Sequence, residues 1–193
     1  KLEIEEDCCH IELSEDSHFD PSEHVRKTSI SSSCGLCGRD SISNLFHIEG
    51  KQINTSHNYS LETIIQSVIT LRSSQNIFSL TGGSHAAGLC DSGGNLRLIA
   101  EDVGRHNAVD KLVGKCLNEG IEHPGDGFLV VSGRASFELV LKSIRFGFPL
   151  MVAVGAPSSL AIDMAKEHDM TLVGFVKDDK ISVYSSPRRI SVS

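Results

Sequence analysis

The chain has 193 residues and a net charge of −7, and its hydrophobic share of 39% is enough to build the core of one good-sized domain. Residues 1–24 hold nine of the 25 acidic residues and one of the 18 basic ones, which leaves 16 acidic and 17 basic residues in the rest of the chain. A body so close to neutral argues against non-specific binding of nucleic acid, and no apolar run is long enough to span a membrane.

The first part of the chain is predicted to contain short strands, a linker and one helix. Apolar and polar residues alternate in parts of residues 1–13, which predicts short strands, whereas residues 14–33 are polar and typical of a linker. Lys1 stands where a complete protein has methionine, so we expect the chain to begin inside a longer protein. Ser60 is predicted to cap a helix over residues 61–73, whose apolar residues fall on one stripe.

The chain beyond residue 85 alternates between strand-like and helix-like segments. Strands are predicted at residues 86–90, 96–100, 128–131, 149–154, 171–176 and 181–184, and helices at 107–118, 135–146 and 158–168. This order predicts an α/β fold, a layered mixed sheet with helices on both faces. Ligands of such sheets bind at the carboxyl ends of the strands, in the turns that lead into helices.

A pair of thiols lies in the segment Cys34-Gly35-Leu36-Cys37-Gly38, just after three serines. Thiols at this spacing can hold a metal ion, form a reversible disulfide or carry a reactive sulfur. The flanking glycines and serines predict a loop open to solvent, which suits a thiol that moves between partners. Two thiols are half of a structural zinc site, and His85 and Cys90 are possible further ligands. No second cysteine pair occurs, so no intrinsic metal is expected.

The six cysteines of the chain show no regular framework. Cys90 and Cys116 lie in apolar segments, and no role can be assigned to Cys8 and Cys9. This usage favours free thiols in a reducing compartment, so a cytoplasmic location is expected.

Two turns at the predicted strand ends carry arginine. In the segment Glu101–Lys111, Arg105 and His106 stand at the start of a helix after Gly104, and Arg134 follows the next strand in the same way. Glycine allows a close approach of the backbone, a helix N-terminus attracts anions, and arginine binds phosphate through two hydrogen bonds. The alternative is that Asp102 or Asn107 caps the helix. His85 follows two glycines at a strand mouth and is a candidate acid–base group or ligand.

Several enzyme classes lose support because their motifs are missing. No Walker sequence occurs, and no G-x-G-x-x-G follows a strand, which argues against ATPases and dinucleotide enzymes. A zinc deaminase needs H-x-E followed later by P-C-x-x-C. His85 is followed by two alanines, and the cysteine pair precedes it, so deaminase chemistry is not expected.

Six segments together resemble the FdhD family, the sulfur carriers required for formate dehydrogenase activity. They are Ser33–Gly38, Thr81–Ala87, Glu101–Lys111, Val131–Leu139, Ala156–Ala161 and Leu172–Phe175, in this order along nearly the whole chain. The resemblance implies a cytidine-deaminase-like α/β fold, used without deaminase chemistry and assembled as a homodimer. It also divides the chain into residues 1–33, the remnant of an N-terminal β region with a linker, and residues 34–193, the sulfur-carrier domain.

The resemblance also implies a sulfur route and its partners. A cysteine desulfurase delivers sulfur as a persulfide, and the carrier passes it to the molybdenum or tungsten bis-guanine-dinucleotide cofactor of formate dehydrogenase. Cys34 matches the persulfide-bearing position and Cys37 its partner. The cofactor, or a fragment of it such as GDP, is expected near the stretch that matches the family's Phe-x-Arg-x-x-Arg, which here reads Phe175, Val176, Lys177, Asp178, Asp179 and Lys180. Lysine replaces both arginines and keeps the charge without the two-pronged geometry.

Two other functions stay open on the sequence alone. The cysteine pair also suits a thiol–disulfide oxidoreductase, and a zinc-stabilised scaffold acting by contact is a further alternative. Our hypothesis is a sulfur carrier that uses Cys34 and Cys37, with Arg105, His106 and Arg134 holding the phosphates of the cofactor.

Overall fold

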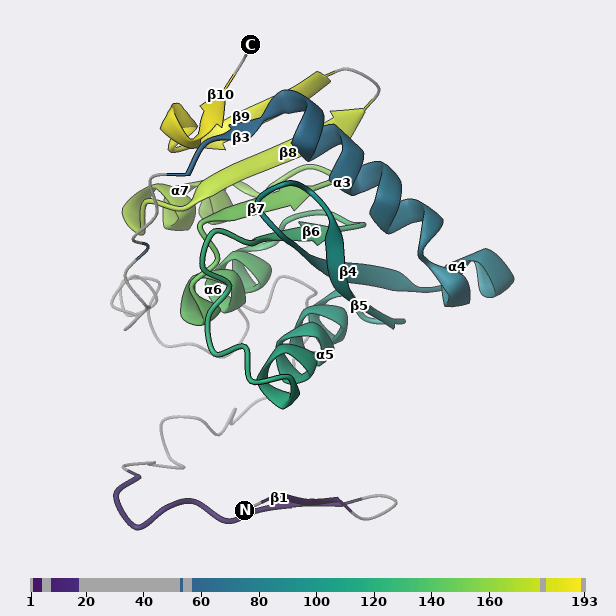
Figure 1. Ribbon diagram of the computed structural model, residues 1–193, viewed down its shortest axis with the longest axis vertical. Helices are drawn as coiled ribbons and strands as arrows, with labels where there is room; N and C mark the ends of the chain where they lie inside the picture. The colour runs from purple at the N-terminus through teal and green to yellow at the C-terminus, as the bar shows by residue number, and fades with distance from the viewer. Residues whose placement is uncertain (1, 5–7, 18–52, 54–56, 178–179, 192–193) are drawn as a thin grey trace.

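The computed structural model describes residues 2–4, 8–17, 53, 57–177 and 180–191 (Figure 1). Within these residues the main body is built on a six-stranded mixed sheet with the strand order β5-β4-β6-β7-β8-β9. The strands of this sheet are β4 (His85–Cys90), β5 (Leu96–Asp102), β6 (Phe128–Val131), β7 (Leu150–Ala153), β8 (Thr171–Lys177) and β9 (Lys180–Ser185). The helices are α3 (Leu61–Ser73), α4 (Asn76–Thr81), α5 (Arg105–Asn118), α6 (Phe137–Phe146) and α7 (Ser159–Glu167).

The strand directions bring several chain turns to one edge of the sheet. Strands β6, β7 and β8 are parallel, whereas β4 is antiparallel to both β5 and β6, and β9 is antiparallel to β8. The carboxyl ends of β5, β6, β7 and β8 therefore lie together with the first residues of β4 and β9. We call this side of the sheet the strand-end edge.

Two apolar cores lie on opposite faces of the sheet. Alternate residues of β6 show the division, since Leu129 and Val131 pack with α5, α6 and α7, whereas Phe128 and Val130 pack with α3. All four of these side chains are buried, as a strand covered on both faces requires. The predicted layered fold with helices on both faces is confirmed.

Most predicted elements are found close to their predicted bounds. Helix α3 has the predicted bounds, with Ser60 Oγ accepting a hydrogen bond from Thr63 N at 3.0 Å. The hairpin of β4 and β5 and the strands β6 to β9 are also present. Helix α5 starts two residues earlier than predicted, at Arg105, and α6 starts two residues later. The delay in α6 arises because Ala135 forms a parallel bridge with Pro157 instead of joining the helix.

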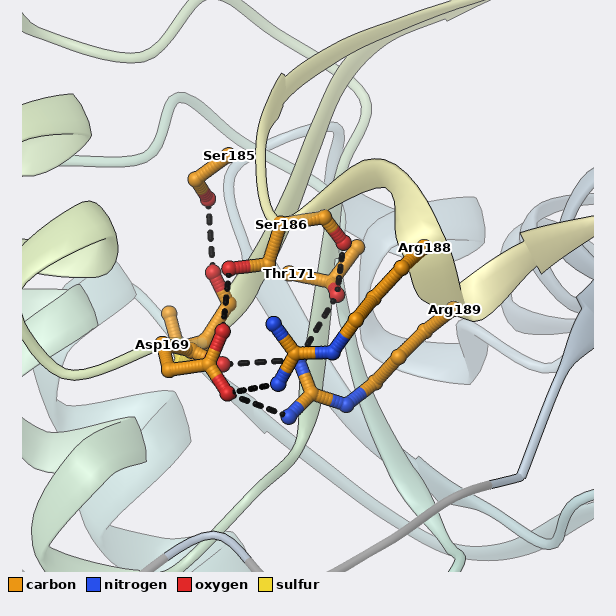
Figure 2. A network of polar contacts seen from close by, with 7 residues as sticks. Asp169, Thr171, Ser185, Ser186, Arg188 and Arg189 are labelled. Carbon is orange, nitrogen blue, oxygen red and sulfur yellow. Dashed lines mark hydrogen bonds and ion pairs between the residues drawn. The ribbon is translucent and has the colours of Figure 1, made fainter.

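The C-terminal elements were not predicted from the sequence. A 3-10 helix, η1 (Pro187–Arg189), leads into β10 (Ile190–Ser191), which pairs in parallel with β3 (Tyr59–Ser60). Arg189, which is 2% exposed, anchors these elements. It donates to Asp169 O at 2.7 Å and to Asp169 Oδ2 at 2.9 Å, and Figure 2 shows how the two side chains face each other. Through β10, the last described residues therefore pair with β3, the strand that leads directly into α3.

The N-terminal strands are present as a separate hairpin of β1 (Leu2–Ile4) and β2 (Cys9–Ile11). This confirms the short strands predicted for residues 1–13. The predicted boundary between residues 33 and 34 and the Cys34-x-x-Cys37 motif lie outside the described residues. None of the helices in the described part of the chain has the length and apolar character that crossing a membrane requires.

Candidate anion site at the strand ends

The strand-end edge gathers candidate binding residues that are far apart in the sequence. His85 begins β4, Arg105 begins α5, Arg134 follows β6, and Phe175 lies near the end of β8. Glycines and backbone hydrogen bonds between the turns join these residues into one row.

Gly133 connects the first members of the row. A methyl group placed on Gly133 would lie 3.4 Å from His85 Nδ1 and 4.0 Å from Arg105 Cδ, so both side chains lie over this glycine. Ser132 is held in place because its hydroxyl accepts a hydrogen bond from Ala86 N at 2.9 Å and its own N–H donates to Ala86 O at 3.0 Å. The turn after β6 is therefore fixed against β4, directly beside His85.

Gly155 continues the row toward β8. A methyl group on Gly155 would lie 2.9 Å from Arg134 Cγ, a separation that real side chains essentially never show. Gly155 N donates to Gly133 O at 3.0 Å, and Ala135 N donates to Ala156 O at 3.2 Å. The pairing of β6 with β7 thus extends into the turns, and the stem of Arg134 runs over a glycine in the neighbouring turn.

Phe175 closes the row with an exposed aromatic ring in a strained backbone. Its φ is 51°, its side chain is 52% exposed, and its N–H donates to Gly155 O at 3.3 Å. A left-handed conformation is costly for a bulky residue and persists where surrounding contacts impose it, often at functional sites. An exposed ring held in this way can stack on a planar ligand.

The other residues of the predicted stretch after Phe175 behave differently from one another. Lys177 and Lys180 are exposed and face each other as partners in the hairpin of β8 and β9. Val176 is buried in the core on the α3 face, so the prediction that it binds the cofactor is not supported for its side chain. Asp178 and Asp179 lie outside the described residues.

Two helices begin at this edge without a side-chain cap. The N-cap residues Gly104 of α5 and Ser136 of α6 make no side-chain capping hydrogen bond. Ser158 at α7, by contrast, accepts from Ala161 N at 3.2 Å and so caps that helix. Uncapped helix N-termini attract anions, so the row of His85, Arg105 and Arg134 lies where negative charge is favoured.

Asp102, which lies shortly before α5, has structural partners. Asp102 accepts from Gly104 N at 2.8 Å and from Asn107 Nδ2 at 3.1 Å, and it pairs with Lys111. These contacts, the Lys111 hydrogen bond first, lower the pKa of Asp102 to about 2. Asp102 thus closes the turn before the helix, but these contacts do not include an N–H group of the first helical turn, so the alternative in which Asp102 or Asn107 caps α5 is not found among them.

His106 points along the start of α6 instead of joining the row. Its Nε2 lies 3.0 Å from Ser136 Oγ and 3.9 Å from Glu138 Oε2. Burial is the main cause that lowers the pKa of His106, opposed by the Glu138 charge, so the neutral ring is favoured. Direct phosphate binding by His106 is therefore not what the geometry supports, and its side chain instead links the turns after β5 and β6.

The model of the FdhD/NarQ family matches residues 1–191 of the chain. The chain belongs to the FdhD/NarQ family. It is 44% identical over 162 residues to a "Sulfur carrier protein FdhD" of Picrophilus torridus, covering 83% of this chain and 62% of that protein. A protein of the same description from Thermoplasma acidophilum is 45% identical over 167 residues, covering 86% of this chain and 58% of the relative.

A solved structure supports the fold. It belongs to a protein of Desulfotalea psychrophila that is provisionally described as a formate dehydrogenase accessory protein. The TM-score is 0.68 at 30% identity, over 77% of this chain and 62% of that one. Our chain thus spans about three fifths of the length of the FdhD relatives that it matches.

The body cysteines of this FdhD/NarQ chain are poor nucleophiles. Burial raises the pKa of Cys90 to about 12 and also raises the pKa of Cys116. Cys8 is exposed. His85 and Cys90 lie at opposite ends of β4, roughly 16 Å apart at the usual rise of a strand, so they cannot share the metal ion considered from the sequence.

Proposed function

We propose that this chain is a sulfur carrier that supports formate dehydrogenase, taking sulfur from a cysteine desulfurase and passing it to the bis-guanine-dinucleotide cofactor of that enzyme. Membership of the FdhD/NarQ family is the observation that carries the proposal, together with the names of the relatives. The row at the strand-end edge adds physical support, since it offers cations, uncapped helix N-termini and an aromatic ring at one place.

The first step is a sulfur transfer between thiols. The Cys34 thiolate attacks the outer sulfur of the donor persulfide, so the donor's sulfur–sulfur bond breaks and the donor leaves as a thiolate. Cys34 then carries the persulfide, and no net oxidation occurs in this exchange. The inert thiols of Cys90 and Cys116 are not expected to compete, because their raised pKa values keep them protonated.

Release uses the second thiol of the motif. The Cys37 thiolate attacks the inner sulfur of the Cys34 persulfide, which forms a Cys34–Cys37 disulfide and expels hydrosulfide toward the cofactor. The two cysteine sulfurs are oxidised and the transferred sulfur is reduced, so electrons balance. A dithiol reductant then restores both thiols for the next cycle.

The strand-end edge is proposed to hold the phosphates and one guanine of the cofactor, which is the substrate of the carrier. Arg105 and Arg134 donate to phosphate oxygens, and Phe175 stacks on the base. Gly155 fits this ligand because its missing side chain leaves room for the stem of Arg134. Lys177 and Lys180 add positive charge at the end of the row, and His85 provides a further polar contact.

Intact-protein mass spectrometry tests the sulfur step. The parent chain is incubated with an active cysteine desulfurase and cysteine, and a gain of about 32 Da that reductant removes is expected for each bound sulfur. The gain should vanish in Cys34→Ala and survive in Cys37→Ala, which lacks the releasing thiol. Cys8→Ala is the matched control, because it removes an exposed thiol from outside the motif.

The same experiment separates the alternatives. A gain that persists in Cys34→Ala would overturn the assignment of the carrier residue. No gain in any form, with a reversible loss of two hydrogens between Cys34 and Cys37 instead, would favour the thiol–disulfide oxidoreductase. Bound zinc at one ion per chain with no gain would favour the scaffold.

We further propose that the carrier works as a homodimer in the reducing cytoplasm. Free, deeply buried thiols such as Cys90 are typical of proteins from reducing compartments. Light scattering coupled to size-exclusion chromatography tests the dimer, and a mass of one chain would contradict it.

A further inference from the structure

Helix α4 is attached to the body without a buried side chain of its own. All six residues of the helix are exposed, and Leu80 is 86% exposed. A helix this short does not form on its own in water. Its N-cap residue, Gln75, makes no side-chain capping hydrogen bond. An open groove lined by Ile77, Ile99 and Lys111 runs beside it, so packing does not explain why α4 is ordered.

One carboxylate from a distant strand supplies the missing cap. Glu101, in β5, accepts hydrogen bonds from Ile77 N and Phe78 N, both at 2.9 Å. It also accepts from Ser84 Oγ at 2.8 Å. A negative charge at a helix N-terminus satisfies its unpaired N–H groups and interacts favourably with the helix dipole. Glu101 therefore binds both the first turn of α4 and the segment that follows the helix.

The contact with Ser84 leads directly to the strand-end edge. Ser84 is buried and immediately precedes His85, whose ring lies over Gly133 beside Arg105. The segment between α4 and Ser84 contains Gly82, which has a φ of 65°, and Gly83, and both are exposed. Without Glu101, this glycine segment offers little resistance to movement, and His85 would be held by its place in β4, where it pairs with Asp102 of β5, without support from the segment before it.

We propose that Glu101 is a positioning residue that latches the segment 76–84 to β5 and thereby sets the place of His85 in the anion site. The part that concerns the anion site rests on the proposed function, whereas the latch itself does not. The donors to Glu101 have different effects. The two N–H groups of α4 stabilise the helix through this contact, whereas the Ser84 hydroxyl fixes the backbone next to His85.

Hydrogen exchange measured on the chain without ligand tests the latch. In Glu101→Ala the amides of Ile77 and Phe78 should exchange at least tenfold faster than in the parent, whereas Glu101→Gln, which keeps one acceptor oxygen, should show a smaller rise. Ser84→Ala should leave these amides protected. Asp110→Asn is the control for loss of a carboxylate, since Asp110 pairs with Lys142 instead. Protection of Val130 and Val152 in the central strands verifies that each variant is folded.

Nitrogen NMR of the imidazole ring tests the positioning role. The His85 signals are assigned from their loss in His85→Gln. Glu101→Ala and Ser84→Ala should both change the nitrogen chemical shifts of the His85 ring, and Glu101→Gln should restore most of the parent pattern. A purely structural role of Glu101 would change the stability of the variants and leave the His85 signals as in the parent.

The outcomes for the latch and for the proposed function can be told apart. Exchange of Ile77 and Phe78 within twofold of the parent in a folded Glu101→Ala would overturn the latch. Faster exchange with an unchanged His85 spectrum would overturn the positioning role. Binding of GDP is measured separately by calorimetry, and its absence in the parent would count against the proposed function alone. A Glu101→Ala affinity at least fivefold weaker than the parent's would support both.

Discussion

The stem of Arg134 lies directly over Gly155, so close that a single methyl group on the glycine would lie 2.9 Å from Arg134 Cγ and 3.1 Å from Arg134 Cα. The two residues follow neighbouring parallel strands, and hydrogen bonds between their turns hold them together. The Arg134 side chain can therefore take this direction because Gly155 has no side chain.

Gly155→Ala is predicted to displace Arg134 and weaken GDP binding about tenfold. Because the contact involves the arginine backbone as well as its stem, we also expect a loss of about 1–3 kcal/mol in stability, as for overpacking. Calorimetry and urea unfolding measure the two effects. Gly114→Ala is the control, because a methyl group there meets nothing within 4 Å and helix propensity should raise stability by roughly 0.5–1 kcal/mol. An unchanged GDP affinity in Gly155→Ala would contradict the role of Arg134.

Arg189→Met is predicted to lower the free energy of unfolding by about 3 kcal/mol, the scale for loss of a buried charged partner. Arg188→Met should cost less than about 1 kcal/mol, although both arginines pair with Asp169, because the Arg188 side chain is 63% exposed. Both arginines lie against Asp169 (Figure 2), so urea denaturation of the two variants makes a matched comparison. Equal losses would show that burial of Arg189 is not what stabilises the C-terminal elements.

Asp102 is predicted to titrate near pH 2, below its ordinary pKa of 3.8, chiefly because of the Lys111 hydrogen bond. A folded-state pKa below the unfolded one means that the stabilisation is present above about pH 4 and is lost as pH falls through about 2. Carbon NMR of the carboxyl group measures the midpoint. In Lys111→Met the midpoint should rise toward the ordinary value, and no rise would assign the low pKa to the backbone contacts instead.

Lys115→Ala is predicted to increase self-association through β5, an edge strand of the main sheet. Lys115 Nζ donates to Ile99 O at 2.7 Å and so occupies an outward-facing carbonyl that another strand could otherwise use. Light scattering over a concentration series should show earlier growth in apparent mass than for the parent. Lys166→Ala, which removes an exposed charge from α7, should behave as the parent does. If both variants associated to the same degree, the loss of one positive charge would explain the effect, and the contact of Lys115 with Ile99 would not.

Local patterns predicted most of the elements because each depends on neighbours in the sequence. Ser60 and the apolar stripe that follows it were enough to set the bounds of α3, since capping and helical periodicity act over a few residues. The continuous apolar run of Phe128–Val131 likewise predicted a strand. Helix α4 gave no such signal, because its cap comes from Glu101, 23 residues away from Phe78.

The candidate site was predicted in part. The turns that carry Arg105 and Arg134 were expected at the strand ends, because alternating strands and helices place such turns at one edge. The contact of His106 with Ser136, at 3.0 Å, was not predicted, since the neighbours of His106 in sequence do not reveal it. The burial of the Val176 side chain was not predicted either, because alternation within β8 decides which side chains face the core.

The sequence by itself determined the fold class, the order of the main elements, the reactive-thiol hypothesis and the family, because these depend on residue types at short spacing. Only the tertiary structure decided that His85, Arg105, Arg134 and Phe175 form one row, that Glu101 caps α4, and that Arg189 is buried. These features depend on strand order and on which glycines leave room for a neighbouring side chain. Contacts between residues far apart in the chain come into being when the sheet assembles, so local sequence carries no direct record of them.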